Sequence, residues 1–249
     1  MAGVMIVTGA GRGIGAAVAR LGAAHGYRVC VNYGRSEASA EALVQTIRDG
    51  DGEAIAVQAD VSQEFQVERL FAAVDEAFGP VTALVNNAGV LGPTVPIRDI
   101  DAEGLHRLFA INTLAYILCA REAVRRVSTS GGGKGGVIVN ISSRSAVHGG
   151  LPTEVAYAAT KGAIDSFTIG LAKEVAKEDI RVAGIRPGLI LTDIYEPVGG
   201  GEAVKKLAPT AVPMARVGSP DEVAEAAIWL CSDQASYITG TTLDVSGGR

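Results

Sequence analysis

Tyr157 and Lys161 have residue types and a spacing that suit proton transfer. They lie four positions apart in the segment YAATK, so a helix would place both side chains on one face. A free phenol has a pKa near ~10 and is a poor acid or base at neutral pH, whereas a neighbouring ammonium group favours the phenolate and lowers that pKa. Acid–base catalysis works best when the pKa approaches the working pH. We therefore predict that Tyr157 exchanges a proton with a carbonyl or alcohol oxygen; the alternative is a helix on which both side chains only pack and are solvated.

Ser142 and Ser143 offer a hydroxyl group that would assist the same chemistry. They follow the apolar segment Gly136–Ile141, which is expected to be a central strand, and open α/β sheets bind ligands at the carboxyl ends of such strands. A serine hydroxyl there hydrogen-bonds a substrate oxygen and stabilises the charge that develops on it. Adjacent strand residues face opposite ways, so we expect only one of the two serines to point into the site.

Three glycines near the start of the chain, Gly9, Gly13 and Gly15, predict an anion site. They lie between a predicted strand, Val4–Thr8, and a predicted helix that begins at Gly13. A dinucleotide pyrophosphate binds at the first strand–helix turn of a doubly wound sheet, because the N–H groups and dipole of the helix start favour an anion. Side chains would block that approach, so the glycines, with Ile14 between them, are assigned to cofactor binding. The alternative is a glycine-rich turn without a ligand.

Residues after the second predicted strand favour NADP(H) over NAD(H). Many NAD sites place an acid about 20 residues beyond the glycine turn, where it accepts hydrogen bonds from the ribose hydroxyls. No Asp follows this strand, and Arg35 and Ser36 occupy the region instead. An acid would repel a 2′-phosphate, whereas Arg12 and Arg35 are able to pair with one. Glu37 weakens this interpretation, and the alternative is that both arginines are solvated surface residues.

The elements that would position these groups alternate between strands and helices. Short runs rich in Val, Ile and Ala are typical of parallel strands covered on both faces, and the longer segments between them show helical patterns. Ser62 precedes one helix as a candidate cap, and Ser219 and Pro220 open another. Alternation at this spacing predicts an α/β fold with one doubly wound parallel sheet and helices on both faces. The predicted strands are Val4–Thr8, Arg28–Asn32, Ala54–Gln58, Ala83–Asn86, Gly136–Ile141, Arg181–Arg186 and Thr242–Val245, and the predicted helices are Gly13–His25, Ser39–Asp49, Glu64–Phe78, Ala102–Arg126, Ala156–Lys177 and Asp221–Leu230.

Length and composition fit one domain over residues 1–249. The net charge of −5 argues against a nucleic-acid partner or an anionic membrane surface. Apolar runs are shorter than the roughly 18 residues of a membrane span, and no signal-peptide pattern is found. Cys30, Cys119 and Cys231 are far apart and form no CxxC pair, so we expect buried free thiols, no metal site and a reducing, cytoplasmic location.

Several further motifs occur in order along the chain. VTGAGRGIG opens it, ADV and LVNNAG end the third and fourth predicted strands, VNISS ends the fifth, YAATK opens a helix and RPG follows the sixth strand. Over nearly the whole chain they resemble the short-chain dehydrogenase/reductase family in its single-domain form. The resemblance implies a Rossmann fold and hydride transfer between a nicotinamide cofactor and a carbonyl/alcohol pair. The C-terminal half is similar to glucose-1-dehydrogenase-like members that reduce sugars or ketones.

The resemblance also assigns roles to individual residues. The second serine of such a pair usually serves in the family, so we prefer Ser143, which lies fourteen residues before Tyr157; this is one position further than is common and suggests a longer loop. Asn112 would hold a water in a proton relay from Lys161 to solvent, the alternative being a satisfied core amide, and Lys161 would also hold the nicotinamide ribose. The implied cofactor set is completed around the adenine and its ribose by Asp60, Val61, Asn86, Ala88 and Gly89, and at the nicotinamide end by Pro187, Gly188, Ile190 and Thr192. For Asn86 the alternative is a turn that only ties strands together.

The leading hypothesis is an NADP(H)-dependent oxidoreductase acting on a small ketone, aldehyde or sugar-like substrate. Its catalytic set is Asn112, Ser143, Tyr157 and Lys161. We expect the segments 91–96, 144–154 and 193–214 to determine the substrate, with 193–214 as a lid because of its weak periodicity and three consecutive glycines.

Two other functions are compatible with these motifs, and the family resemblance also implies an oligomeric state. Reduction of a 3-oxoacyl group on an acyl carrier protein would need a basic docking surface; Arg125 and Arg126 favour it, whereas Glu178 and Asp179 fall where such reductases tend to carry Arg-Gly. A dinucleotide sensor or scaffold is the non-enzymatic alternative, although such relatives usually lose the Tyr or the Lys. The resemblance implies a homotetramer, or a homodimer, that pairs through its two long helices and C-terminal segment.

Overall fold

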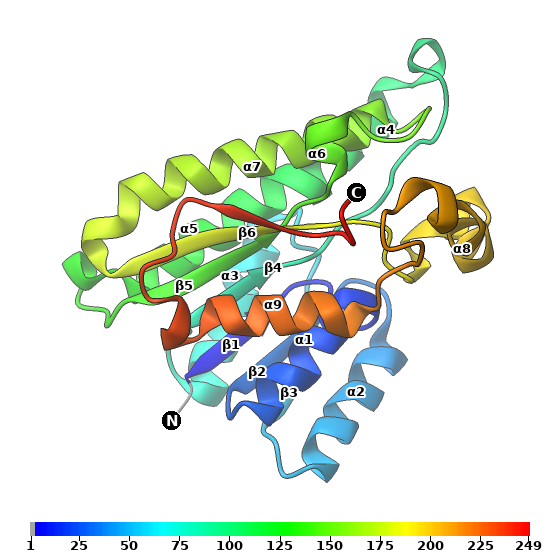
Figure 1. The fold of residues 1–249 in the computed structure, drawn as a ribbon. Coiled ribbons are helices and arrows are strands. Elements are labelled where there is room, and N and C mark those ends of the chain that lie inside the picture. The colour runs from blue at the N-terminus through cyan, green and yellow to red at the C-terminus, as the bar shows by residue number, and fades with distance from the viewer. Residues whose placement is uncertain (1–2) are drawn as a thin grey trace.

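Seven parallel strands form one sheet in the order β3-β2-β1-β4-β5-β6-β7. The computed structural model describes residues 3–249 (Figure 1). Strand order reverses between β1 and β4, so this is the position where ligands bind to doubly wound sheets. The predicted α/β fold is confirmed, with strand bounds within one residue of those expected. The strands are β1 (Val4–Val7), β2 (Arg28–Tyr33), β3 (Ala54–Gln58), β4 (Ala83–Asn86), β5 (Gly136–Ile141), β6 (Ile180–Pro187) and β7 (Thr242–Val245).

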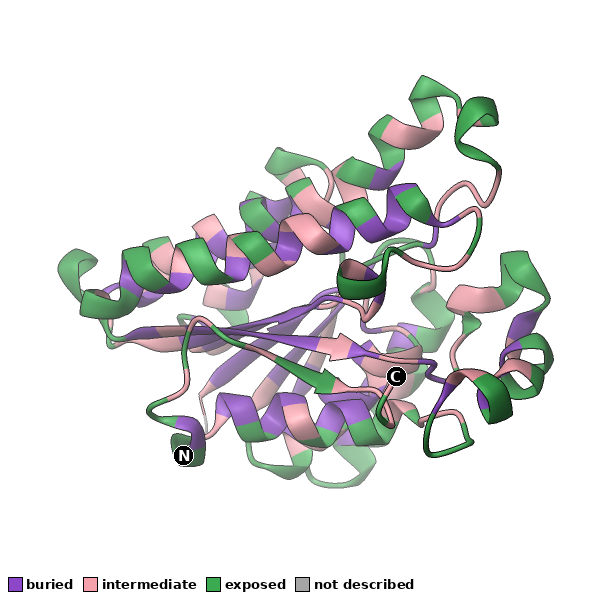
Figure 2. Ribbon diagram, turned by 45° about the horizontal axis from the view of Figure 1, so that its top comes forward, coloured by how far each residue is buried: buried purple, intermediate pink, exposed green. Residues whose placement is uncertain are grey.

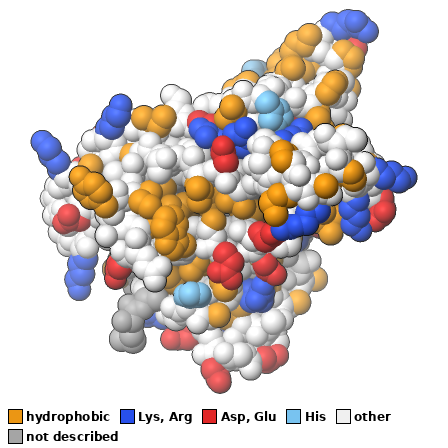
Figure 3. Space-filling model, in the orientation of Figure 1, with side chains coloured by type: hydrophobic (Ala, Val, Ile, Leu, Met, Phe, Trp, Pro, Cys, Tyr) orange, Lys and Arg blue, Asp and Glu red, His pale blue; other side chains and the backbone are white. Residues whose placement is uncertain are grey.

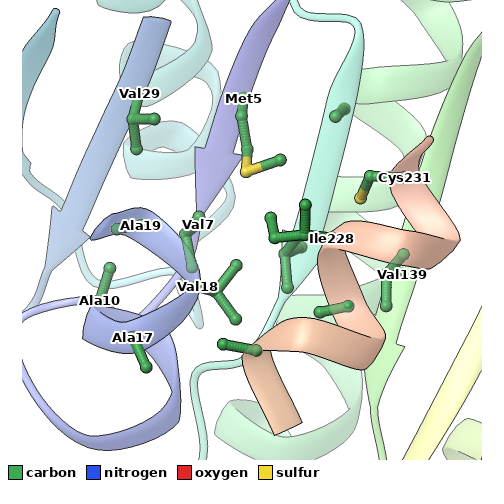
Figure 4. Close-up of a cluster of buried hydrophobic side chains, with 14 of the residues drawn as sticks. Met5, Val7, Ala10, Ala17, Val18, Ala19, Val29, Val139, Ile228 and Cys231 are labelled. Carbon is green, nitrogen blue, oxygen red and sulfur yellow. The ribbon is translucent and has the colours of Figure 1, made fainter. Parts of the chain in front are cut away.

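Helices cover both faces of the sheet, and two apolar cores lie between the layers (Figure 2). Alternate residues of β1 face opposite cores: Met5 and Val7 lie in one, and Val4 and Ile6 in the other, as the period of two in a strand requires. Figure 4 shows the first core, in which Met5 and Val7 lie beside Ile228. Its helices are α1 (Gly13–Ala24), α2 (Glu37–Asp49) and α9 (Pro220–Cys231), whereas α3 (Glu64–Phe78), α5 (Ala115–Val127) and α7 (Val155–Val175) cover the other face.

The long helix predicted over Ala102–Arg126 is interrupted. The structure has α4 (Ala102–Phe109), a π-helical segment (Ala110–Leu114) and α5 in its place. A π-helical turn holds one extra residue and is common at functional sites. Periodicity did not reveal it, because the apolar residues continue through the segment.

Helix caps were predicted correctly at one position and wrongly at another. The Ser219 side chain accepts a hydrogen bond from Glu222 N, while the Glu222 side chain accepts one from Ser219 N, so the pair forms a capping box. Ser62 does not cap α3, whose first flanking residue is Gln63. The Ser62 hydroxyl instead donates to Asp60 Oδ1 at 2.7 Å.

The segment expected to be a lid is largely helical. It contains a 3-10 helix (Asp193–Val198) and α8 (Gly200–Ala211), which neither glycines nor periodicity predicted. Val204 and Ala208 of α8 pack with Leu189 and Val212 in a small apolar cluster apart from the two main cores. Within residues 3–249, no helix has both the length and the apolar character needed to cross a membrane, and no group of metal-ligating side chains is found.

Candidate active site

Tyr157 and Ser143 line one pocket at the carboxyl ends of β5 and β6. Ser143 follows β5, and Tyr157 lies in the first turn of α7. About 390 Å³ of space, including open solvent, lies between the walls of the pocket. Its walls are Leu91, Ser143, Arg144, Ser145, His148, Leu151, Glu154, Tyr157, Pro187, Gly188, Leu189, Ile194, Tyr195 and Arg249.

Lys161 lies behind Tyr157 and is almost completely buried. Its ammonium group donates to the Ile141 carbonyl oxygen at 2.9 Å and to the Tyr116 hydroxyl at 3.2 Å. The same nitrogen is 5.9 Å from the centre of the Tyr157 ring. The predicted sharing of one helical face therefore brings the two groups together, with the end of β5 fixing the lysine.

Burial dominates the pKa of both groups. It raises the pKa of Tyr157 above that of free tyrosine, while a hydrogen-bonding contact from Ser143 acts in the opposite direction. Burial lowers the pKa of Lys161 to about 7, against an opposing effect of Asp165. The expectation that Lys161 lowers the Tyr157 pKa is not met in the protein alone, because desolvation disfavours phenolate and ammonium alike. Tyr157 consequently holds its proton at neutral pH.

The two adjacent serines point in different directions. The Ser142 hydroxyl donates to the Lys161 carbonyl oxygen at 3.1 Å and so faces α7. Ser143 lines the pocket, and its hydroxyl oxygen accepts from Ser145 N at 3.1 Å. Of the pair, Ser143 is the residue positioned to meet a substrate oxygen.

Asn112 lies in the π-helical segment, where both N–H groups of its amide are donated and its oxygen accepts one hydrogen bond. Its side chain accepts from Val90 N at 2.9 Å and donates to Val90 O at 2.8 Å and to Thr160 Oγ1 at 3.2 Å. A Cβ atom on Gly89 would lie 3.5 Å from Asn112 Oδ1 and 3.7 Å from Lys161 Nζ. Asn112 and Lys161 therefore converge on the backbone at Gly89.

The glycine turn is built so that side chains are excluded. Gly9 has φ +61°, and a Cβ atom there would lie 2.8 Å from the Ala88 backbone. A Cβ on Gly15 would approach Asn87 Nδ2 to 2.5 Å. Asn87 Nδ2 in turn donates to Thr8 O at 2.9 Å. The residues that follow β4 thus pack tightly against the turn and fix it at the start of α1, where backbone N–H groups suit an anion.

Arg12, Arg35 and Ser36 lie around the outer side of this turn. A Cβ on Gly11 would be 3.4 Å from Ser36 Cβ, so Ser36 borders the turn. Arg35 is exposed and has no ion-pair partner within residues 3–249. Arg12 pairs with Asp193 at 3.4 Å, with both side chains more than half exposed. Such a pair contributes about 0–1 kcal/mol, so a phosphate would displace Asp193 at small cost.

Residues assigned to the adenine end occupy different environments. Asp60 is exposed, Val61 is buried, and Ala88 N donates to Thr8 Oγ1 at 3.0 Å. Asn86 is the last residue of β4, and its buried side chain donates to Asn140 Oδ1 at 3.0 Å and to a backbone carbonyl of α5. Its amide therefore ties β4 to β5 and α5, and its assignment to the cofactor stays a prediction.

Residues assigned to the nicotinamide end run from the pocket to the glycine turn. Pro187 and Gly188 line the pocket beside Tyr157, and a Cβ on Gly188 would lie 2.8 Å from the Ser246 backbone. Ile190 is buried, and Thr192 lies across from Gly13, whose Cβ would be 3.4 Å from Thr192 Cγ2. The segment leading into α8 therefore lies directly over the glycine turn.

Three residues of the site were not identified from the sequence. Tyr116 is buried, accepts from Lys161 and donates to Ile141 O at 2.9 Å; its position four residues after Asn112 was an available signal. Burial raises the pKa of Tyr195 to about 12, and this residue lines the pocket from the 3-10 helix. Glu154, three residues before Tyr157, lines it from the N-terminus of α7.

Known proteins of similar sequence and structure are oxidoreductases and reductases. The family model described as enoyl-(acyl carrier protein) reductase matches residues 9–249. The chain is 44% identical over 246 residues to the uncharacterized oxidoreductase YgfF of Escherichia coli (strain K12), with 99% of each chain covered. It is 38% identical over 246 residues to a 3-oxoacyl-[acyl-carrier-protein] reductase of Synechocystis sp., covering 98% of this chain and 96% of that relative. A solved 7α-hydroxysteroid dehydrogenase, complexed with NADH and 7-oxo glycochenodeoxycholic acid, superposes with a TM-score of 0.90 at 32% identity, covering 99% of this chain and 93% of the other.

Proposed function

This chain belongs to the short-chain dehydrogenase/reductase family and is an oxidoreductase, and from that premise we propose that it transfers hydride reversibly between NADP(H) and a small carbonyl/alcohol pair. One observation carries the proposal. The pocket that Ser143 and Tyr157 share opens at the carboxyl ends of β5 and β6, with the Lys161 nitrogen 5.9 Å from the centre of the phenol ring. That arrangement suits proton exchange with a substrate oxygen.

The residues present fit a nicotinamide dinucleotide. The turn at Gly9 and Gly15 packs so closely against Ala88 and Asn87 that it admits no Cβ atom. Backbone N–H groups at the start of α1 are the groups there that suit a pyrophosphate. When bound, the nicotinamide supplies the hydride in reduction and accepts it in oxidation. The residues that would hold the cofactor are Gly9, Arg12, Gly13, Ile14, Gly15, Arg35, Ser36, Asp60, Val61, Ala88, Gly89, Tyr157, Lys161, Pro187, Gly188, Ile190 and Thr192, with Asn86 acting through the backbone it fixes.

Four side chains perform the proton chemistry. In reduction, Ser143 donates a hydrogen bond to the carbonyl oxygen, and Tyr157 transfers its proton to that oxygen. The ammonium form of Lys161 stabilises the phenolate that results. Asn112 holds a water that returns a proton to Lys161 from solvent. Oxidation of the alcohol runs through the same groups in reverse.

Arg35 is expected to select the phosphorylated cofactor. Replacing it by alanine (Arg35→Ala) removes a charge-assisted hydrogen bond worth about 1.5–3 kcal/mol, so the KM for NADPH should rise roughly 10- to 100-fold while the KM for NADH changes little. Steady-state kinetics with both cofactors measures this. Arg98→Ala is the matched control, because Arg98 is 81% exposed and lies away from the turn. Equal losses with both cofactors would refute the assignment.

We further propose that residues 193–214 act as a lid over the cofactor and substrate. Support comes from the Arg12–Asp193 pair and from the approach of Thr192 to Gly13, which place the base of this segment over the glycine turn. Ile194 and Tyr195 reach the pocket from the same segment. Opening at Asp193 would admit the cofactor, and closing would exclude water from the reacting atoms.

A homotetramer, with a homodimer as the alternative, is the assembly that the exposed apolar side chains favour. Ile117 of α5 and Ile169 of α7 are 40% and 42% exposed, and Trp229 of α9 and Leu243 of β7 are 38% and 41% exposed. Figure 3 shows hydrophobic side chains gathered across the face on which α9 and β7 lie. Light scattering of the purified protein tests the oligomeric state.

Cys30, Cys119 and Cys231 are free thiols, which supports a reducing compartment such as the cytoplasm.

Reduction of a 3-oxoacyl group on a carrier protein is the second candidate, favoured by the Synechocystis relative. Its docking surface is weakened in this chain. Arg126 pairs with Asp75 at 2.7 Å and with Glu122 at 2.8 Å, and Arg125 pairs with Glu122 at 2.7 Å. These acids neutralise the two arginines that would attract an acidic carrier.

A substrate panel tests the proposed function. The purified protein is mixed with NADPH and, in turn, with ketones, aldehydes, sugars and an acetoacetyl thioester, and the loss of NADPH absorbance is followed. Turnover of free carbonyl compounds supports the proposal, and turnover restricted to the thioester favours the second candidate. Cofactor binding without turnover of any compound would favour a dinucleotide sensor and refute the enzymatic role.

A further inference from the structure

Glu154 is a buried carboxylate in the wall of the substrate pocket. The residue is 6% exposed and lines the same pocket as Ser143 and Tyr157. One oxygen, Oε2, accepts from Leu151 N at 3.1 Å. The other, Oε1, accepts no hydrogen bond within residues 3–249 and remains accessible to solvent, and Glu154 takes part in no ion pair there. An accessible carboxylate oxygen in the pocket wall offers a free accepting site, so a ligand group that donates a hydrogen bond is able to bind it in place of water.

The backbone holds this carboxylate in place beside the catalytic phenol. Glu154 immediately precedes α7, and a residue three positions before Tyr157 lies about one helical turn from it. Thr153 has φ +74°, which is costly for a β-branched residue. Such strain persists only where surrounding contacts fix it, and it occurs at ligand sites. The loop that ends at Thr153 therefore leads directly to Glu154 in the wall of the pocket.

The other charges of the pocket define the rest of the ligand. Arg144 pairs with Asp244 at 2.6 Å and is neutralised. Arg249 also lines the pocket and lies beyond ion-pair distance from Glu154. Glu154 and Arg249 contribute one side-chain charge of each sign to the pocket, and a hydroxyl group both donates and accepts hydrogen bonds. The lining suits a neutral hydroxylated molecule better than an acyl chain.

We propose that Glu154 determines substrate specificity by accepting a hydrogen bond from a hydroxyl group of the substrate, on a carbon close to the reacting carbonyl. This inference rests on the proposed function and names its substrate class: small neutral hydroxyketones, hydroxyaldehydes and sugars. A site built to pair a substrate hydroxyl discriminates against the analogue that lacks it, because its own polar group is then left unpaired.

Matched substrate pairs test the proposal. Hydroxyacetone and 2-butanone differ by a hydroxyl in place of a methyl group, and 4-hydroxy-2-butanone and 2-pentanone form a second pair with the hydroxyl one carbon further away. We expect the wild-type kcat/KM to favour the hydroxylated member of at least one pair by 10-fold or more. In Glu154→Gln the amide oxygen still accepts from Leu151 N, and the NH2 group offers the substrate hydroxyl a neutral hydrogen bond in place of a charge-assisted one. Because the neutral bond is weaker, that ratio should fall by about 10-fold.

Glu174→Gln is the matched control, since Glu174 is an exposed acid on the same helix, and it should keep the wild-type ratio. A wild-type ratio near one in both pairs would overturn the proposal. An equal fall in kcat for both members of a pair in Glu154→Gln would also overturn it, because Glu154 would then act through Tyr157, whose pKa its charge raises.

A readout without turnover is the increase in Tm on adding hydroxyacetone, which should be smaller in Glu154→Gln than in wild type. Failure of every carbonyl compound to turn over would refute the proposed function, whereas equal Tm increases in both proteins would refute this inference alone.

Discussion

Tyr157→Phe should lower kcat by roughly 10²- to 10⁴-fold, the range that general acid–base catalysis contributes. The substitution removes one hydroxyl from a ring that is 8% exposed, so the packing of α7 against the sheet is preserved. Without that hydroxyl, a substrate oxygen held by Ser143 loses the phenol that would transfer a proton to it. Cofactor binding should change little, because most of the proposed cofactor contacts lie in the glycine turn and after β6.

Two measurements separate catalysis from folding in this variant. kcat is measured by NADPH absorbance, and the dissociation constant for NADPH is measured by protein fluorescence. Tyr237→Phe removes the same hydroxyl from a fully exposed side chain and should retain wild-type kcat. If Tyr157→Phe kept more than a tenth of wild-type kcat, with the control unaffected, another residue would have to supply the proton.

Lys161→Met should change how stability depends on pH. Burial lowers the pKa of Lys161 to about 7, whereas the unfolded chain has a lysine pKa near ~10.4. Between these values the unfolded state binds more protons, so the free energy of unfolding rises with pH by up to about 1.4 kcal/mol per unit. Below the lower value both states are protonated, and the full cost of the buried charge is present. The methionine variant lacks this dependence, so wild type should gain about 2 kcal/mol relative to it between pH 7.5 and 9.

Urea unfolding of the protein without cofactor, at a fixed protein concentration, measures this difference at pH 7.5, 8.2 and 9. The range stays below the pKa of the buried tyrosines, which are common to both proteins. Lys173→Met removes an exposed lysine from the same helix and should follow wild type. Parallel curves for Lys161→Met and wild type would show that the buried amine titrates normally in the folded protein.

Strands and most helices were predictable because the physics that forms them is local. A parallel strand covered on both faces must be apolar at nearly every position, as in Gly136–Ile141. The capping box that begins at Ser219 involves only four consecutive residues. Helix α8 was missed since its three leading glycines and an internal proline, Pro209, oppose helix formation. Its stability comes from packing Val204 and Ala208 on Leu189, which is a contact between distant parts of the chain.

In the candidate site, too, features fixed by local spacing were predictable, whereas features that depend on tertiary packing were not. Tyr157 and Lys161 were found because four-residue spacing on a helix fixes their relation, and the opposite facing of Ser142 and Ser143 follows from strand geometry. The pKa values were not predictable, because they depend on desolvation by the surrounding layers. Glu154 was hidden within a loop whose backbone has positive φ at Gly149, Gly150 and Thr153. Such a path is not apparent from residue types alone.

The π-helical turn between α4 and α5 has a consequence for how this region tolerates change in length. Each residue of a regular helix advances the side-chain direction by about 100°, so residues eight positions apart, such as Leu108 and Tyr116, would face different ways in a regular helix. The π-helical turn absorbs one residue in a wider turn, which places both side chains on one face, and both are buried. Deleting Ile111 would make the pair seven positions apart in a regular helix and would keep that shared face. Deleting one residue within α5 would instead rotate the rest of that helix by about 100°, so the π-helical turn is the part of this region that best tolerates the loss of one residue.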